Sequence, residues 1–238
     1  MRKALLFFIF YLPTFFLMAQ QSKNLKIINS NEIISEGIEK FDNGEYQEAA
    51  NLFKSVPIGD SLFVNAQYEL AYCYYAQQRY NEAIYLLEQI LETPRDINKS
   101  MVYTQLGNTY SEINRFEKAI EMYDNALKMY PYNHQLHYNK GVVYQKMENY
   151  VQSEACFKMA ILCNPLHQGS HLQLGISYLK QYYFIPGILA INFAVMINPQ
   201  SDNAVRALQL LDALFVEGLA NFNADEESTI SSEIAKKN

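Results

Sequence analysis

Residues 103–131 read YTQLGNTYSEINRFEKAIEMYDNALKMYP, and their pattern indicates how the chain folds. In its first half Leu106 and Tyr110 lie four positions apart, which is the spacing of neighbours on one face of a helix. The second half spaces its aromatic residues and alanines in the same way. Asn114 separates the two halves, and Pro131 ends the second because proline cannot continue a helix. The stretch therefore predicts two amphipathic helices joined by a tight turn.

The same pattern occurs five times, at intervals of 34 residues with one interval of 36. Each copy has a small residue, an aromatic residue nine positions later and a second small residue twelve positions later. The first small residues are Gly37, Ala71, Gly107, Gly141 and Gly175, the aromatic residues are Tyr46, Tyr80, Phe116, Tyr150 and Phe184, and the second small residues are Ala49, Ala83, Ala119, Ser153 and Gly187. We expect the small residues to lie where the paired helices cross. An ordinary helical bundle would show no common register.

This combination of small and aromatic residues with a terminal proline resembles the tetratricopeptide repeat over residues 30–201. The resemblance is most complete at Leu106-Gly107, Tyr110, Phe116, Ala119, Tyr123, Ala126 and Pro131. It implies an all-α fold, a right-handed α-solenoid of about five helical hairpins, over residues 30–63, 64–99, 100–133, 134–167 and 168–201. The chain has no Trp, and the position that the family often gives to Trp holds Ile33, Gln67, Tyr103, His137 and His171.

The turns and the C-terminal end follow the same register. Residues that tolerate left-handed backbone are expected at the turn inside a hairpin, at Gly44, Asn114 and Asn149. After the last repeat, Asp202 is expected to cap a C-terminal helix over residues 202–221 that covers the final hairpin. Residues 222–238 are polar, and we expect them to form a disordered tail.

The first nineteen residues have the features of an export signal. A basic pair at positions 2 and 3 precedes an apolar run that ends at Met18, and Ala19 supplies a small residue ahead of a cleavage point. The run is shorter than the ~20 residues that a membrane helix needs. Residues 1–19 are therefore predicted to be a cleaved signal peptide, with an uncleaved anchor as the alternative, and residues 20–29 a linker. We expect an exported protein, periplasmic or extracellular, and its composition resembles that of exported proteins of the Bacteroidota.

Charge and motifs exclude several classes of function. The formal net charge of −6, which would become −8 without the basic pair, disfavours nucleic acid and anionic membranes as partners. No stable membrane insertion is expected once the signal is cleaved. The sequence has no phosphate-binding loop, no glycine-flanked serine elbow and no paired-cysteine motif. We therefore predict neither enzymatic activity nor a cofactor.

Histidines form the one candidate metal group in the sequence: His134, His137, His167 and His171. Histidines three or four positions apart on a helix can share a metal ion, but no carboxylate or thiolate lies at a matching spacing. We expect His137 and His171 to fill the position of a larger ring, and His134 and His167 to be solvated loop residues. No metal site is predicted, and the three cysteines do not form a disulfide framework.

The family's architecture implies a binding groove lined by the first helix of each repeat. The partner-binding residues expected in it are Tyr68, Tyr72, Tyr75, Met101, Thr104, Asn108, Tyr138 and Gln145. Relatives that bind acidic chaperone tails use a clamp of Lys, Arg and Asn, of which only Asn108 has a counterpart. The resemblance thus implies a non-catalytic scaffold that holds a protein or peptide segment. The alternatives are a repeat module of a longer envelope enzyme or glycan-handling polypeptide, or a self-associating assembly subunit.

Overall fold

The computed structural model describes residues 29–94 and 98–216, and every regular element in these ranges is a helix. The chain divides into two compact units, an N-terminal unit (residues 1–73) and a C-terminal unit (residues 74–238). The predicted signal peptide, nearly all of the predicted linker and the polar tail lie outside the described residues. No helix in the described ranges combines the length and apolarity that crossing a membrane requires.

The N-terminal unit contains one helical hairpin and most of a third helix. Helix α2 (Ser30–Asp42) packs on α3 (Tyr46–Lys54), and α4 (Phe63–Ala76) begins in this unit. A Cβ atom at Gly37 would lie 2.5 Å from the Phe53 ring, so the glycine allows the two helices to meet. Asp60 accepts a hydrogen bond from the Leu62 amide at 2.8 Å just before α4 begins.

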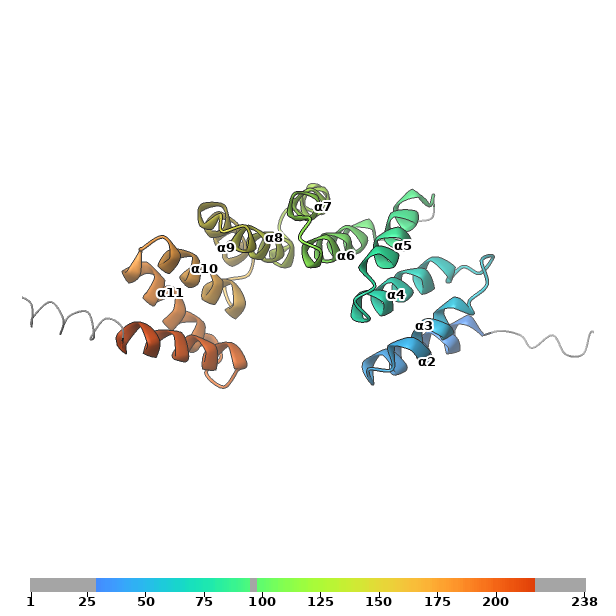
Figure 1. Ribbon diagram of the computed structural model, residues 1–238, viewed down its shortest axis with the longest axis horizontal. Coiled ribbons are helices and arrows are strands. Elements are labelled where there is room, and N and C mark those ends of the chain that lie inside the picture. Colours follow the sequence, from blue (N-terminus) through green and yellow to red (C-terminus); the bar gives the residue numbers. More distant parts are fainter. Residues whose placement is uncertain (1–28, 95–97, 217–238) are drawn as a thin grey trace, which may run out of the picture. The chain divides into compact units, whose positions relative to one another are not determined.

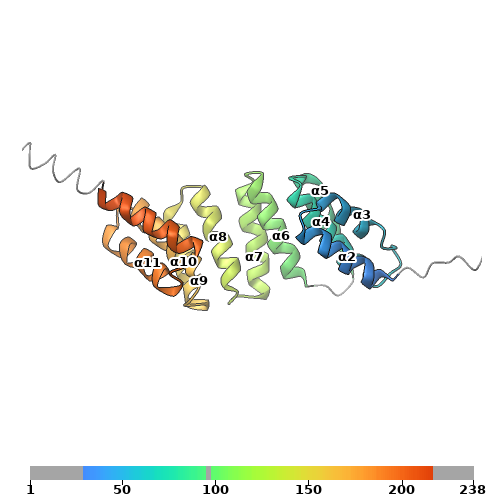
Figure 2. The same cartoon turned by 90° about the horizontal axis from the view of Figure 1, so that it is seen from below.

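The C-terminal unit is a row of hairpins in chain order. After the end of α4 come α5 (Tyr80–Glu92), α6 (Lys99–Glu112), α7 (Phe116–Met129), α8 (His134–Lys146), α9 (Tyr150–Cys163), α10 (Gln168–Lys180), α11 (Phe184–Ile197) and a helix over residues 202–216. From α5 to α11 each helix packs on the next, and α8 also contacts α6 and α10 (Figures 1 and 2). The predicted all-α array of helical hairpins is therefore confirmed, and the first helices α6, α8 and α10 share one surface.

Glycines explain how closely the paired helices approach. A Cβ atom at Gly107 would lie 2.6 Å from the Tyr123 ring, and one at Gly141 would lie 2.7 Å from the Phe157 ring. Real Cβ atoms essentially never come this close to a neighbour. Each ring belongs to the residue sixteen positions after its glycine, on the second helix of the same hairpin. The sixteen-residue spacing between glycine and ring in the sequence therefore corresponds to a contact between the two helices, in which the large side chain covers the glycine backbone.

The turn inside each hairpin contains one residue with left-handed backbone. These residues lie seven positions after the first small residue and are Gly44, Gln78, Asn114, Glu148 and Tyr182, with φ between 57° and 80°. The prediction for Asn149 was wrong, because its φ is −85° and its side chain caps α9 by accepting a hydrogen bond from the Gln152 amide at 3.2 Å. Its backbone amide donates to the Tyr144 carbonyl at 2.9 Å, which closes the turn. The geometry of the turn therefore requires a left-handed backbone at this position, whichever residue type occupies it.

The helix over residues 202–216 closes the described part of the stack. Its cap is Ser201 and not Asp202 as expected, because the Ser201 hydroxyl accepts a hydrogen bond from the Ala204 amide at 3.1 Å. The same hydroxyl lies 2.7 Å from Gln168 Oε1 on α10. Ala207 joins Leu172, Ile191 and Ala194 in a buried apolar cluster, so one face of this helix covers the last hairpin.

Candidate functional site: a pocket on the first helices of two repeats

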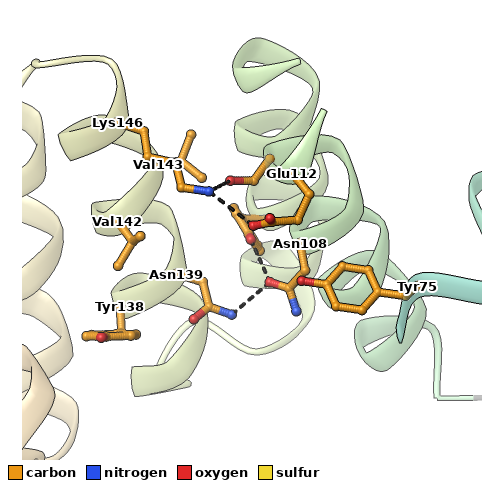
Figure 3. A pocket seen from close by; sticks show the side chains of 10 residues that line it. Tyr75, Asn108, Glu112, Tyr138, Asn139, Val142, Val143 and Lys146 are labelled. Atoms are coloured by element: carbon orange, nitrogen blue, oxygen red, sulfur yellow. Dashed lines mark hydrogen bonds and ion pairs between the residues drawn. The ribbon is translucent and has the colours of Figure 1, made fainter. Parts of the chain in front are cut away.

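An open pocket of about 180 Å³ lies on the surface that α6 and α8 share within the C-terminal unit (Figure 3). Its lining combines tyrosines, carboxamides, aliphatic side chains and one ion pair. The lining residues are Tyr75, Asn108, Ser111, Glu112, Tyr123, Tyr138, Asn139, Val142, Val143 and Lys146. Most come from first helices because α6 and α8 pack side by side, whereas Tyr123 reaches the pocket from α7 beneath.

Asn108 is the central polar residue of this pocket. The buried Tyr123 hydroxyl donates a hydrogen bond to Asn108 Oδ1 at 2.7 Å, and Asn139 Nδ2 donates to the same oxygen at 3.1 Å (Figure 3). These two donors fix the orientation of the Asn108 carboxamide. Within the described residues no protein group accepts a hydrogen bond from its amide nitrogen, so two N–H donors remain for a ligand.

An ion pair occupies the rim of the pocket. Lys146 Nζ lies 3.1 Å from Glu112 Oε1 and donates to Ser111 Oγ at 3.1 Å. Both charged side chains are more than a third exposed, so the pair contributes only about 0–1 kcal/mol to stability. Its main effect is to place a cation and a carboxylate together at the edge of an otherwise uncharged pocket.

Two tyrosines provide ring surface to the pocket. The Tyr75 ring packs at 5.6 Å from the Tyr80 ring, and the Tyr138 ring lies 5.7 Å from Phe157 and 5.0 Å from His167. Burial raises the pKa of Tyr138 above its usual value, so its hydroxyl is neutral at physiological pH. Because neighbouring rings hold both tyrosines, these two side chains would lose little conformational entropy when a ligand packs against them.

The structure brings together three of the eight predicted site residues, Tyr75, Asn108 and Tyr138. Met101 is half exposed on α6 and does not line this pocket. The Thr104 hydroxyl donates to the Ser100 carbonyl of its own helix at 2.7 Å. Gln145 donates to the Gln173 carbonyl at 3.0 Å and to Ser177 Oγ at 2.9 Å, which ties α8 to α10.

The remaining predicted pair, Tyr68 and Tyr72, belongs to the N-terminal unit. Their hydroxyl oxygens lie 3.5 Å apart and their rings 5.2 Å apart, edge to face. Tyr72 also lies 6.4 Å from the Phe41 ring. Burial raises the pKa of Tyr68. Both residues are half-buried, so the pair packs against its neighbours and is still partly exposed to solvent.

Asn139 and the Glu112–Lys146 pair were missed by reasoning from the sequence. Glu112 and Lys146 are 34 residues apart and therefore hold the same position in successive repeats. Opposite charges at the same position of successive repeats predict an ion pair between neighbouring first helices. The ion pair could therefore have been predicted from the sequence. The hydrogen bond from Asn139 to Asn108 spans 31 residues, an offset that repeat periodicity does not reveal.

The histidines are used by the fold. His137 Nε2 lies 2.8 Å from the Pro131 carbonyl oxygen, and His171 Nε2 lies 2.8 Å from that of Pro165. The expectation that His134 and His167 are solvated was wrong: both are half-buried, and their rings pack 4.9 Å apart. His167 also caps α10 by accepting a hydrogen bond from the Ser170 amide. The described residues contain no group of three or more His, Cys, Asp or Glu that could hold a metal ion.

The three cysteines are free thiols, with Cys73 buried and the other two half-buried. Burial raises the pKa of Cys73 to about 12 and that of Cys156 to about 11. A thiol with such a pKa carries almost no thiolate at neutral pH, so neither residue has the character of a nucleophile.

Comparison with known proteins supports the repeat assignment. Two tetratricopeptide repeat profiles match residues 62–131 and 104–161. No curated protein sequence matches significantly.

Several solved structures share the fold. A thermophilic tetratricopeptide repeat protein of Thermus thermophilus is 20% identical with a TM-score of 0.62, over 76% of this chain and 98% of that one. MamA (41-end) from Desulfovibrio magneticus RS-1 is 14% identical with a TM-score of 0.62, over 73% of this chain and 97% of that one. MamA of AMB-1 is 21% identical with a TM-score of 0.55, over 74% and 94% of the two chains. At these identities the likeness shows the fold alone.

Proposed function

We propose that this protein is a non-catalytic interaction scaffold and that the pocket on α6 and α8 holds a segment of a partner protein. The observation that carries the proposal is the Asn108 carboxamide, whose oxygen is fixed by two donors while its two N–H groups have no acceptor among the described residues. A backbone carbonyl of an extended peptide supplies the acceptor that this site lacks.

The size of the pocket supports a peptide ligand over a cofactor. Small-molecule sites have volumes of roughly 300–1,000 Å³ and enclose most of the ligand. The pocket here has about 180 Å³ and is open to solvent, which suits one or two side chains of a segment that continues along the surface. The half-buried Val142 and the rings of Tyr75 and Tyr138 favour an apolar side chain, and the Glu112–Lys146 pair favours a polar neighbour.

The pocket can be tested with selected peptides. Peptides chosen from a random display library for binding to the chain are measured by calorimetry against wild type and Val142→Glu. The Val142 side chain makes no hydrogen bond, so the substitution adds a charge to the pocket without removing a polar contact, and we expect at least a tenfold loss of affinity. Met129→Glu is the matched control, because Met129 is exposed on α7 outside the pocket. Equal affinities for Val142→Glu and wild type would contradict the proposal.

The tyrosine pair of the N-terminal unit is proposed as a second contact for the partner, since both rings are half-buried and lie edge to face. Recovery of the partner by wild type is compared with recovery by Tyr68→Ala combined with Tyr72→Ala. We expect the double variant to retain less of the partner. Unchanged recovery by a variant that still gives a helical circular dichroism spectrum would remove these two residues from the site.

Export to the periplasm or beyond is part of the proposal, and the N-terminal sequence is its support: a basic pair, an apolar run and Ala19. The N-terminal residue of the protein recovered from its host tests this point. Cleavage after Ala19 would give Gln20 as the first residue. An intact N-terminus starting at the initiator Met would contradict it.

A further inference from the structure

Helix α11 has an exposed face without charge. The helix reads FIPGILAINFAVMI and contains no Asp, Glu, Lys or Arg. Ile185, Leu189 and Met196 are 75%, 64% and 74% exposed, although a helix that is apolar all round is normally buried. Large apolar patches on a water-soluble surface mark interaction sites.

A comparison within the chain shows that the repeat itself does not require these apolar residues. The positions of Ile185, Leu189, Asn192 and Met196 on α11 correspond, 68 residues earlier, to Glu117, Glu121, Asp124 and Lys128 on α7. The four charged side chains line one face of α7. The hairpin fold therefore accepts charge at every one of these positions, and α11 carries three large apolar side chains and a neutral amide instead.

The apolar face continues onto the helix over residues 202–216. An open depression of about 600 Å³ lies between this helix and α11 and is lined by Ile188, Asn192, Leu208, Leu211, Asp212, Leu214 and Phe215. Phe215 is 67% exposed at this depression. The surface thus contains both an apolar hollow and a projecting ring.

The sequence after α11 does not contain a sixth copy of the repeat pattern. In each hairpin a small residue is covered by a large apolar side chain sixteen positions later: Phe53, Leu87, Tyr123, Phe157 and Ile191. A sixth repeat in the same register would have Gln209 at the small position and Asp225 at the apolar one. A polar residue at each position removes the pair on which hairpin packing depends, so the pattern that covers every earlier first helix is missing here.

We infer that the exposed apolar face of α11, together with the adjoining helix over residues 202–216, is a self-association surface that takes a second copy of this chain. The chain has a net charge of −6, so two copies repel each other where charged surfaces meet, whereas Asp212 is the one charged residue among those that line this depression. A hollow beside a projecting Phe215 can be matched by the same surface rotated by two-fold symmetry.

The extent of the surface fits a dimer. Six apolar side chains contribute most of it, Ile185, Ile188, Leu189, Met196, Leu208 and Phe215. With their exposed fractions, side chains of this size present on the order of 700 Å² of apolar surface, close to the ~800 Å² per partner that a standard protein interface buries. No residue of this surface lines the pocket on α6 and α8, so dimerisation leaves the pocket's lining uncovered by this face.

The test is the mass of the purified full chain in solution, measured by analytical ultracentrifugation from low micromolar to high micromolar concentration. We expect wild type to form a dimer at the upper concentrations. The variant Leu189→Glu plus Met196→Lys installs the charges that α7 carries at the same positions, on side chains already exposed to solvent. We expect the dimer dissociation constant of this variant to rise at least 100-fold, with an unchanged circular dichroism spectrum.

The matched control is Tyr85→Glu plus Tyr132→Lys, which makes the same change of charge on exposed aromatic residues elsewhere. It should dimerise like wild type. A monomeric wild type at every concentration overturns the inference, including the case in which the wild type sediments instead with vesicles of neutral phosphatidylcholine. A charged α11 variant that folds and dimerises like the control also overturns it.

Discussion

Single side chains set the approach of the two helices in each hairpin. Gly141 lies beneath the Phe157 ring, and a Cβ atom there would come within 2.7 Å of it. We expect Gly141→Ala to lower the free energy of unfolding by about 1 kcal/mol, because overpacking costs about 1–3 kcal/mol and the gain in helix propensity returns up to ~1 kcal/mol. The larger Gly141→Leu should cost more. Chemical denaturation measures both.

The control for this prediction is Gly59→Ala, since no atom lies within 4 Å of a Cβ built at Gly59. It should change the free energy of unfolding by less than about 0.5 kcal/mol. Combining Gly141→Ala with Phe157→Leu should restore part of the loss, because the second repeat has Ala71 and Leu87 at the same two positions. A double variant whose losses simply add would show that the ring is not the cause.

The left-handed backbone of Glu148 predicts that a substitution at this residue stabilises the protein, in contrast to the substitutions at Gly141. Glu148 is exposed and has a φ of 58°, a region that costs an L-residue with a Cβ roughly 1–2 kcal/mol. Glu148→Gly should raise the free energy of unfolding by about 1 kcal/mol, after the larger entropy of glycine in the unfolded chain is subtracted. Glu148→Ala keeps the Cβ and should bring no such gain. Equal stabilities of the Gly and Ala variants would contradict this assignment.

The residue types alone predict where the paired helices cross, but they do not predict every left-handed residue in the turns. Bare backbone at Gly107 and Gly141 is required by the ring above it, so the residue type reports the contact directly. A left-handed turn residue is tolerated when the backbone hydrogen bonds of the turn enforce it. At Glu148 and Tyr182 the next residue along the chain donates to the carbonyl of Tyr144 or Tyr178. For that reason the asparagine at 149 was mistaken for the left-handed residue that lies one position before it.

At the scale of helices, capping explains where α8 and α10 begin. Asn133 caps α8 by accepting hydrogen bonds from the amides of Gln135 and Leu136, and His167 holds the same repeat position before α10. Burial, followed by the nearby His134 and His171, lowers the pKa of His167 below 6.5. The neutral ring is therefore the form that the folded chain favours.

This cap predicts a dependence of stability on pH. Because the folded chain binds a proton at His167 less readily than the unfolded chain, the stabilisation is full above the unfolded pKa of 6.5 and is lost as pH falls through the lower folded pKa. The free energy of unfolding of wild type should fall between pH values of about 7.5 and 5. In His167→Asn, which imitates Asn133, this fall should be smaller. The prediction is wrong if the free energy of unfolding falls by the same amount in both proteins between these two pH values.

Helix type and order were predictable from periodicity, whereas helix ends depended on contacts that periodicity does not show. Ser201 caps the last described helix because its hydroxyl also reaches Gln168 on α10, a pairing across 33 residues. Asp202, which is an equally good cap by residue type, is instead the first helical residue. Tertiary contacts therefore decide between neighbouring candidates for a cap.

At the scale of the whole molecule, the fold class could be predicted and the site only in part. Five registered repeats specify hairpins, and hairpins place Tyr75, Asn108 and Tyr138 on first helices. The sequence could not show which inward residues are used up by the fold, such as Thr104 and Gln145, because their partners come from the local backbone and from the next repeat. Side-chain contacts between repeats select the residues that remain available to a ligand.

Site-specific photocrosslinking in the native host measures whether a partner protein occupies the pocket on α6 and α8. A photoreactive amino acid is placed at Val142 in the pocket or at Glu121 on the exposed face of α7. We expect a discrete crosslinked partner from position 142 that is lost when Lys146→Glu is added, and no such product from position 121. The same product from both positions, or none from position 142, would contradict it.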